Sequence, residues 1–273
     1  MTQHIPAFTA TLILLLLMTA CSGSDSDNRS DAGTRTVSDS NSDITMEQPD
    51  NSSFNYNVTR INQPVEINSE WDKEPWRDIP SLRLTNYMGD EPDHRPNTEV
   101  KVAYDEEAVY VIFLVDDQYV RCVVEEYQGP VYTDSCVEFF FVPGTDLAEG
   151  YFNLETNCGG TALFHFQKDN ERNGQVKIPR SVFDTIDLAH SLPEVVDPLI
   201  TEPVSWTLEY RLPIDILTQY SEVSLPDSGV EWRANFYKIG DRTSHPHWLT
   251  WSFVDHPRPN FHLPEYFGTL TFE

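Results

Sequence analysis

The chain has 273 residues, of which 18 are Lys or Arg and 44 are Asp or Glu, so its formal net charge is −26 at pH 7. A hydrophobic fraction of 39%, with 6 Trp, 12 Tyr and 15 Phe, is enough for a packed core and excludes a wholly disordered chain. The negative balance argues against nucleic acid as a partner, because phosphate binding needs Lys and Arg, and against docking on anionic lipid through a basic patch.

The first 20 residues predict a signal peptide. The apolar run Leu12–Met18 is shorter than the roughly 20 residues of a membrane-spanning helix and has the length of a signal-peptide h-region. The ending Met18-Thr19-Ala20-Cys21 resembles a bacterial lipobox, so Cys21 is the expected lipidation site. An ordinary cleaved signal with an incidental Cys21 is the alternative. Ser22 is not the Asp of an inner-membrane retention signal, so the expected location is the cell envelope as an anchored lipoprotein, with the outer membrane favoured.

Residues 21–53 predict an acidic tether. The segment is rich in Ser and Asp and contains no aromatic residue before Phe54. It has little apolar surface to bury against the entropy cost of ordering, so we expect it to be disordered and extended by charge repulsion. The folded domain is expected over 54–273.

Alternation of apolar and polar residues dominates 54–273 and predicts strands. These runs are rich in Val, Phe, Tyr and Thr and are bounded by Gly, Pro, Asp and Asn. The predicted strands are 99–104, 108–115, 136–142, 151–157, 161–166, 205–212, 232–239 and 268–272. A short helix is predicted over 213–220, which begins with proline. Many strands without crossover helices predict an all-β fold, an antiparallel β-sandwich.

Three strands are predicted to pair an apolar face with a polar one. Alternate residues share a face, so Val137, Phe139 and Phe141 should face the core. The opposite faces should carry Tyr132, Asp134, Cys136, Glu138 and Phe140; Tyr151, Asn153, Glu155 and Asn157; and Arg233, Asn235 and Tyr237. If the strands are neighbours, these faces form a polar surface with aromatic edges. The pattern predicts either a binding face or a plain solvated sheet face.

The order and spacing of several segments resemble the family 9 carbohydrate-binding modules. The matching segments are Val65–Asn68, Trp76, Val100–Asp105, Val109–Val111, Asp116, Tyr132–Phe140, Tyr151–Asn157, Trp206–Glu209, Leu212-Pro213, Trp251-Ser252 and Phe261–Gly268. They cover nearly all of 58–273, and Tyr132–Phe140 is the most specific. The resemblance is closest to free-standing bacterial members. It implies a β-sandwich that captures poly- or oligosaccharide without catalysis and supports carbohydrate catabolism beside separate hydrolases.

The resemblance also implies a site. In the family two aromatic rings sandwich a terminal sugar, and polar side chains between them bind its hydroxyls. Tyr132 and Phe261 fall on the positions of the family's two Trp, Glu138 on its Glu, and Asn153 on its Arg, which is absent here. Rings cover the C–H faces of a pyranose, while carboxylates and amides bind its hydroxyls. The other expected sugar-binding residues are Glu155, Arg258, Asn260 and His262.

The sequence also leaves three alternative functions open: glycoside hydrolysis, haem binding and metal binding. Glu138 and Glu155, if on adjacent strands, could be the acid/base pair of a glycoside hydrolase. Met88 could ligate haem in a related sandwich. His245 and His247, with His256 and His262 nearby, could bind a metal, although surface and packing histidines are favoured. The family often holds structural calcium, for which the candidate ligands are Asp105, Glu106, Asp116 and Asp117.

Three cysteines follow Cys21, at positions 122, 136 and 158. In an oxidising compartment one disulfide and one free thiol are expected, and Cys136 could pair with either of the others. Trp76, Trp206 and Trp251 are predicted to pack in the core rather than to contact a ligand.

Overall fold

The computed structural model describes residues 53–168 and 174–273. The predicted signal peptide over 1–20, the lipidation site Cys21 and the tether over 21–53, apart from Ser53, lie outside the described residues. Within the described ranges the α-helices are α1 (Arg180–Phe183) and α2 (Ile214–Leu217). No helix in these ranges is long and apolar enough to cross a membrane.

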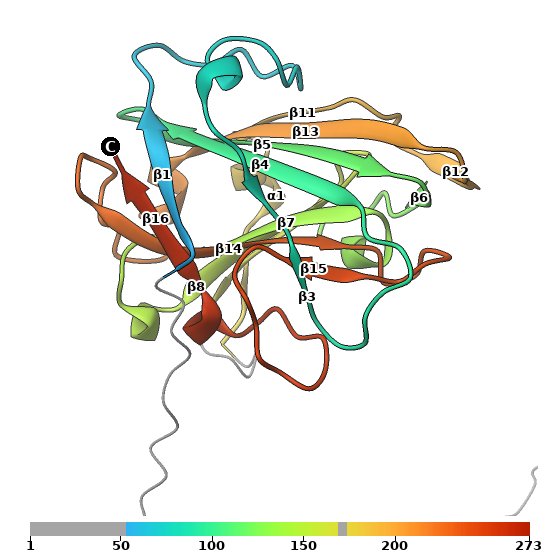
Figure 1. The fold of residues 1–273 in the computed structure, drawn as a ribbon. Helices are drawn as coiled ribbons and strands as arrows, with labels where there is room; N and C mark the ends of the chain where they lie inside the picture. Colours follow the sequence, from blue (N-terminus) through green and yellow to red (C-terminus); the bar gives the residue numbers. More distant parts are fainter. Residues whose placement is uncertain (1–52, 169–173) are drawn as a thin grey trace, which may run out of the picture. The chain divides into compact units, whose positions relative to one another are not determined.

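Sixteen strands occur in the described part of the chain, fourteen of them in one sheet (Figure 1). They are β1 (Asn55–Arg60), β2 (Leu82–Arg83), β3 (Asn86–Tyr87), β4 (Asn97–Tyr104), β5 (Ala108–Asp117), β6 (Val120–Cys122), β7 (Cys136–Val142), β8 (Tyr151–Asn157), β9 (Ala162–Gln167), β10 (Val176–Lys177), β11 (Asp187–His190), β12 (Val196–Ile200), β13 (Val204–Pro213), β14 (Glu231–Ile239), β15 (Trp248–Thr250) and β16 (Gly268–Phe272). The main path is β10-β9-β8-β7-β14-β16-β1-β4-β5-β13-β11. β15 lies beside β14, β3 beside β15 and β2 beside β4, while β6 and β12 form a separate pair.

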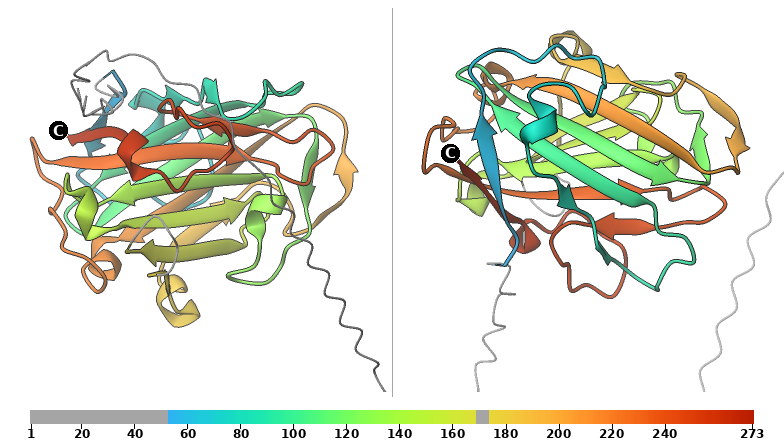
Figure 2. Two further views of the ribbon diagram at one scale, coloured as in Figure 1. Left: turned by 90° about the horizontal axis from the view of Figure 1, so that it is seen from below. Right: turned by 45° about the horizontal axis from the view of Figure 1, so that its top comes forward.

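The sheet folds over into two layers, which Figure 1 shows one above the other and the left view of Figure 2, from below, shows one behind the other. One layer holds β7, β8, β9, β14 and β16, and the other holds β4, β5, β11 and β13. β1 joins the layers, because its residues 55–58 pair with β16 and its residues 59–60 pair with β4. The all-β sandwich predicted from the sequence is confirmed. Both pairings of β1 are parallel, however, so the sheet is antiparallel apart from this strand.

The core lies between the layers and is rich in aromatic rings. Phe139 stacks on Phe236 at 4.8 Å between ring centroids, and Phe141 stacks on Trp232 at 5.7 Å. Val137 is also buried, so the apolar face predicted for 136–142 is confirmed. Trp206 and Trp251 are buried in this core and Trp76 in a separate cluster outside it, so all three are packing residues, as the sequence predicts. Burial of this much apolar surface is the main source of stability in such a domain.

The outer face of the β4–β5–β13 layer is covered by the segment between β1 and β2. Trp76 and Ile79 of this segment pack on Tyr110 and Ile112 of β5. The buried carboxylate of Glu209 holds the segment down. It accepts hydrogen bonds from the Trp76 indole at 2.7 Å, from the Lys73 ammonium at 2.7 Å, and from the backbone N–H groups of residues 68 and 69 at 3.0 and 2.7 Å.

The outer face of the other layer is partly covered by the C-terminal segment 253–267. Phe261 and Phe267 of this segment pack in one cluster with Phe140, Tyr151 and Tyr237 of the strands. The polar face, for which alternation predicts either a binding face or a solvated one, is therefore not a plain solvated face. Glu138, Asn153 and Glu155 are only 2%, 1% and 5% exposed. Sequence alternation identifies which residues share a face, whereas the covering segment has no periodicity that would reveal it.

Strand bounds predicted from alternation agree closely with the structure. Those for 136–142, 151–157 and 268–272 match β7, β8 and β16. Tyr132 is different, because it lies in a 3₁₀ turn over Val131–Thr133 and not on the extended strand. Asp134 follows this turn, and its carboxylate accepts hydrogen bonds from the backbone N–H groups of residues 123 and 124 at 2.9 and 2.8 Å, which tie the chain before β7 to the segment after β6. The predicted helix over 213–220 shortens to α2.

The expected disulfide is not present, since Cys122, Cys136 and Cys158 are all free and buried. Cys136 faces the outer cluster, whereas Cys122 and Cys158 belong to the core between the layers. The Cys122 thiol donates a hydrogen bond to the Glu194 carbonyl oxygen at 3.2 Å. Burial, followed by the nearby carboxylates of Glu138 and Glu155, raises the pKa of the Cys136 thiol well above its ordinary value.

Candidate functional site

The outer faces of β7, β8 and β9 bring polar side chains together in rows. Glu138 on β7 lies opposite Glu155 on β8. In the next row Asn153 of β8 lies between Phe140 of β7 and His165 of β9. Side chains directly opposite one another in adjacent strands have Cβ atoms about 4.5–5.5 Å apart, so these rows form a continuous surface.

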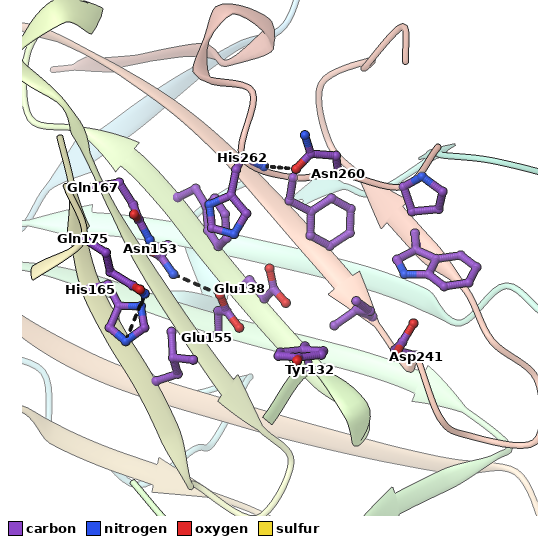
Figure 3. Close-up of a pocket in the computed structure, with 16 residues that line it drawn as sticks. Tyr132, Glu138, Asn153, Glu155, His165, Gln167, Gln175, Asp241, Asn260 and His262 are labelled. Atoms are coloured by element: carbon purple, nitrogen blue, oxygen red, sulfur yellow. Dashed lines mark hydrogen bonds between the residues drawn. The ribbon is translucent and has the colours of Figure 1, made fainter. Parts of the chain in front are cut away.

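This surface is the floor of a pocket with a cavity volume of about 290 Å³, at the lower end of the roughly 300–1,000 Å³ of small-ligand sites. Figure 3 shows Glu138 near the middle, with Tyr132 and Asp241 on one side and Asn260 and His262 on the other. The described lining residues are Tyr132, Glu138, Phe140, Asn153, Glu155, Leu163, His165, Gln167, Gln175, Ile239, Asp241, Trp248, Pro259, Asn260, Phe261 and His262.

The pocket brings together most of the sugar-binding residues expected from the sequence. Those that line it are Tyr132, Glu138, Asn153, Glu155, Asn260, Phe261 and His262. Arg258 does not line it. Its side chain is exposed, and its backbone N–H donates to His256 at 3.3 Å, so the exposed turn around His256 takes Arg258 away from the floor.

The two expected aromatic rings have unequal surroundings. Tyr132 is 40% exposed, so much of its ring is open to a ligand. Phe261 is only 7% exposed and stacks on Tyr237 with 4.0 Å between centroids, so one of its faces is already covered. Trp248 at the start of β15 is half-buried and also lines the pocket. The pocket therefore has a third aromatic wall that sequence reasoning missed.

Hydrogen bonds organise the polar floor. The Asn153 amide donates to the Glu155 carboxylate at 2.9 Å, and the Gln167 amide donates to the Asn153 oxygen at 3.0 Å. Figure 3 shows this part of the floor, with Gln175 in contact with His165 at its edge. On the C-terminal segment, His262 shares a hydrogen bond of 2.8 Å with the Tyr151 hydroxyl. Such contacts fix side-chain positions before any ligand arrives.

The polar lining residues missed from the sequence are His165, Gln167, Gln175 and Asp241. A signal for two of them existed. His165 and Gln167 alternate with the buried Phe164 and Phe166 along β9, in the same way as the polar residues of β8. Asp241 and Gln175 lie outside regular alternation and come to the pocket only through the fold.

The candidate calcium ligands do not converge. Asp105 follows β4, while Asp116 and Asp117 end β5, which places them at opposite ends of the β4–β5 hairpin. Asp105 accepts hydrogen bonds from the backbone N–H groups of residues 107 and 108 and from the Tyr110 hydroxyl, and Glu106 is ion-paired with Arg60. Among the described residues no group of three or more His, Cys, Asp or Glu side chains could hold a metal ion.

The histidine-rich segment divides into separate environments. His247 is buried and accepts a hydrogen bond from the Lys238 ammonium at 2.8 Å, while Lys238 also pairs with Asp117 at 3.3 Å. His245 stacks on Tyr119 with 3.6 Å between centroids. His256 lies in the turn described above and His262 in the pocket. The packing interpretation therefore holds for His245 and His247. Met88 is buried in the outer cluster.

Comparisons with known proteins agree with this architecture. A "putative carbohydrate-binding protein" from Bacteroides uniformis ATCC 8492 is 29% identical, with a TM-score of 0.71, over 80% of this chain and 99% of that one. A carbohydrate-binding module of family 9 from Caldicellulosiruptor kristjanssonii, solved with glucose and with cellotriose, is 14% identical, with a TM-score of 0.54, and this likeness concerns the fold alone. The matches cover 80% of this chain and 95% and 93% of those chains.

A search of curated proteins returned no match. The model of carbohydrate-binding family 9, by contrast, matches residues 70–272, which is most of the chain and nearly all of its folded part, and the chain belongs to this family.

Proposed function

We propose that the pocket on β7, β8 and β9 binds a neutral sugar ring at the end of a poly- or oligosaccharide, and that the protein captures carbohydrate without catalysis. One observation carries the proposal. Residues far apart in the sequence, Tyr132, Glu138, Asn153 and Phe261, were assigned to a sugar site by family resemblance, and they line a single pocket. Membership of the carbohydrate-binding family supports the same function.

The chemistry of the lining suits a pyranose. The open ring of Tyr132 offers a face for the C–H groups of a sugar, and Trp248 or the free side of Phe261 offers a second. Between them lie carboxylate and amide groups that can accept from and donate to hydroxyls. The described lining residues include Glu138, Glu155 and Asp241 but neither Lys nor Arg, which favours a neutral ligand over an anionic one.

The arrangement of Glu138 and Glu155 argues against hydrolysis. A glycosidase places its two carboxyl groups on either side of the scissile bond. Here both residues lie side by side on neighbouring strands of the same floor, and Glu155 is held by the Asn153 amide. A sugar in the pocket would have both carboxyl groups beneath it, which suits hydroxyl recognition.

A glycan array followed by a hydrolysis assay tests this function. Glucose and cellotriose are the first probes, because the solved Caldicellulosiruptor kristjanssonii module binds them. We expect saturable binding of at least one neutral glycan and no release of reducing sugar from it. Absence of binding to every glycan on the array would contradict the proposal, and product release that Glu138→Gln abolishes would identify a hydrolase instead.

We also propose that the protein is exported and anchored in the bacterial outer membrane through lipid on Cys21, with 22–53 as a spacer. The apolar run before Cys21 and the Ser/Asp-rich composition after it support this proposal. The wild-type chain should partition into the detergent phase, and Cys21→Ala should move it to the aqueous phase. A wild-type chain found wholly in the aqueous phase would contradict the anchor.

A further inference from the structure

Gln167, the last residue of β9, has an amide whose nitrogen makes a hydrogen bond and whose oxygen makes none within the described residues. The residue is 1% exposed and lines the pocket. Its Nε2 donates to Asn153 Oδ1 at 3.0 Å. Its Oε1 is buried and has no hydrogen-bond partner within the described residues. Buried carbonyl oxygens normally accept a hydrogen bond from protein, water or ligand, so this oxygen is an exception that needs a donor.

The direction of the hydrogen-bond chain on the floor fixes which end of Gln167 is left over. A carboxylate only accepts, so Asn153 must present its Nδ2 to Glu155, as it does at 2.9 Å. The Oδ1 of Asn153 then faces Gln167 and must accept from its Nε2. Reversing the Gln167 amide would place two acceptor oxygens against each other. Gln167 is therefore committed to offering Oε1, an acceptor, as the free end of the chain.

We propose that Gln167 Oε1 is a specificity determinant that accepts a hydrogen bond from one hydroxyl of the bound sugar. This inference rests on the proposed function and extends it to the class of ligand. The sugar must carry a free hydroxyl at the carbon that meets Gln167, so a sugar that is deoxygenated or O-alkylated there is rejected. A site built around a hydroxyl discriminates strongly against an analogue that lacks it, because the polar group of the protein is then left buried without a partner.

The test compares a sugar with its monodeoxy derivatives. Calorimetric titration of the full chain with glucose, galactose, mannose and xylose selects the best-binding parent sugar, and each monodeoxy derivative of that sugar is then titrated. Derivatives that lack a hydroxyl bound by another floor group should also weaken, but for the wild-type protein we expect one derivative to bind at least tenfold more weakly because Gln167 loses its donor.

Two variants assign that loss to Gln167. Gln167→Met removes the acceptor, so it should bind the parent at least tenfold more weakly and no longer distinguish the parent from that derivative. Gln167→Glu keeps an oxygen acceptor but loses the donor to Asn153, so it should still distinguish them. Gln118→Met makes the same chemical change outside the pocket, where the amide only donates to the Thr201 carbonyl oxygen, and should bind as the wild type does.

The outcomes separate this inference from the proposed function. Wild-type protein that binds none of the four sugars and no glycan of the array overturns both. Wild-type protein that binds a parent and all of its monodeoxy derivatives within a factor of two overturns the role of Gln167 alone, even if Gln167→Met does not fold. Equal weakening of the parent and every derivative in Gln167→Met also overturns it, because that pattern indicates a purely structural role.

Discussion

Side chains on the pocket floor serve the fold as well as the ligand, and Glu138 is the clearest case. It is 2% exposed, between Glu155 on one neighbouring strand and Tyr237 on the other. Glu138→Gln replaces a charge-assisted hydrogen bond by a neutral one, and such bonds differ by about 1 kcal/mol or more. We expect sugar affinity to fall roughly tenfold in calorimetric titration.

If the Glu138 carboxylate were exposed, the substitution Glu138→Gln would leave the melting temperature of the protein unchanged. Because this one is buried, we expect a measurable shift, which differential scanning calorimetry detects. Unchanged affinity for the sugar that binds the wild type would exclude Glu138 from the site.

Single substitutions can also distinguish the contributions of the two aromatic walls Phe261 and Trp248. Phe261 is packed on Tyr237, so Phe261→Ala should lower both stability and sugar affinity, with a stability cost of about 3–5 kcal/mol for a buried Phe. Trp248 is half-buried, so Trp248→Ala should lower affinity with a smaller loss of stability. Urea unfolding and titration of the two variants measure both quantities. A Trp248→Ala protein with wild-type affinity would leave Phe261 as the second wall.

At the scale of elements, the strands that form the floor could be predicted because their alternation is strict. Phe139 and Phe141 point to the core while Glu138 and Phe140 point away, and the bounds of β7 follow directly. The way segment 253–267 covers this face could not be predicted from alternation, since the segment packs through irregular turns. Alternation therefore identifies residues that share a face but leaves open whether the floor is a binding face or a solvated one. Gln167 was missed although it alternates along β9, whereas Trp248 comes to the pocket only through the fold.

The covering segment on the other layer gives an element-scale prediction. Trp76 is fully buried there and donates to Glu209 at 2.7 Å. Trp76→Ala should lower the free energy of unfolding by about 3–5 kcal/mol. This layer lies on the opposite side of the core from the pocket, so the folded variant should keep wild-type sugar affinity. Urea titration and calorimetry at a temperature where the variant is folded check this. Lost affinity in a folded protein would show that the two faces are coupled.

On the scale of the whole domain, a buried charge network ties the end of β5 to β14 and to the loop before β15. Burial raises the pKa of the Asp117 carboxyl, but the Lys238 ammonium and the hydrogen bond from His94 lower it more, so the net pKa lies well below its ordinary value. Burial, and then Lys238, lower the pKa of His247 to about 3. Ile239 and Trp248 flank this network and line the pocket, so the network supports one pocket wall.

This network predicts how stability depends on pH. The folded pKa of His247 is depressed, so between about pH 6.5 and pH 3 the unfolded chain binds a proton that the folded chain does not. The contribution of neutral His247 to the free energy of unfolding is complete above about pH 6.5 and is lost as the pH falls. At about 1.4 kcal/mol per pH unit, His247 should cost the wild type on the order of 2 kcal/mol between pH 7 and pH 5.

His247→Gln lacks the titrating group and should lose less stability over the same interval. Urea unfolding of both proteins at pH 7 and pH 5 measures the difference. Equal losses in the two proteins would show that His247 does not titrate in this range on unfolding.

One calorimetric comparison decides whether this domain binds carbohydrate at the pocket beside Tyr132. Tyr132 and Phe253 are both exposed rings, at 40% and 46%, but only Tyr132 lines the pocket. With the glycan that binds the wild type best, we predict one site per chain. Tyr132→Ala should lower affinity about tenfold, since ring contacts contribute roughly 1–2 kcal/mol, whereas Phe253→Ala should match the wild type. Wild-type affinity in Tyr132→Ala would show that the sugar binds elsewhere than in this pocket.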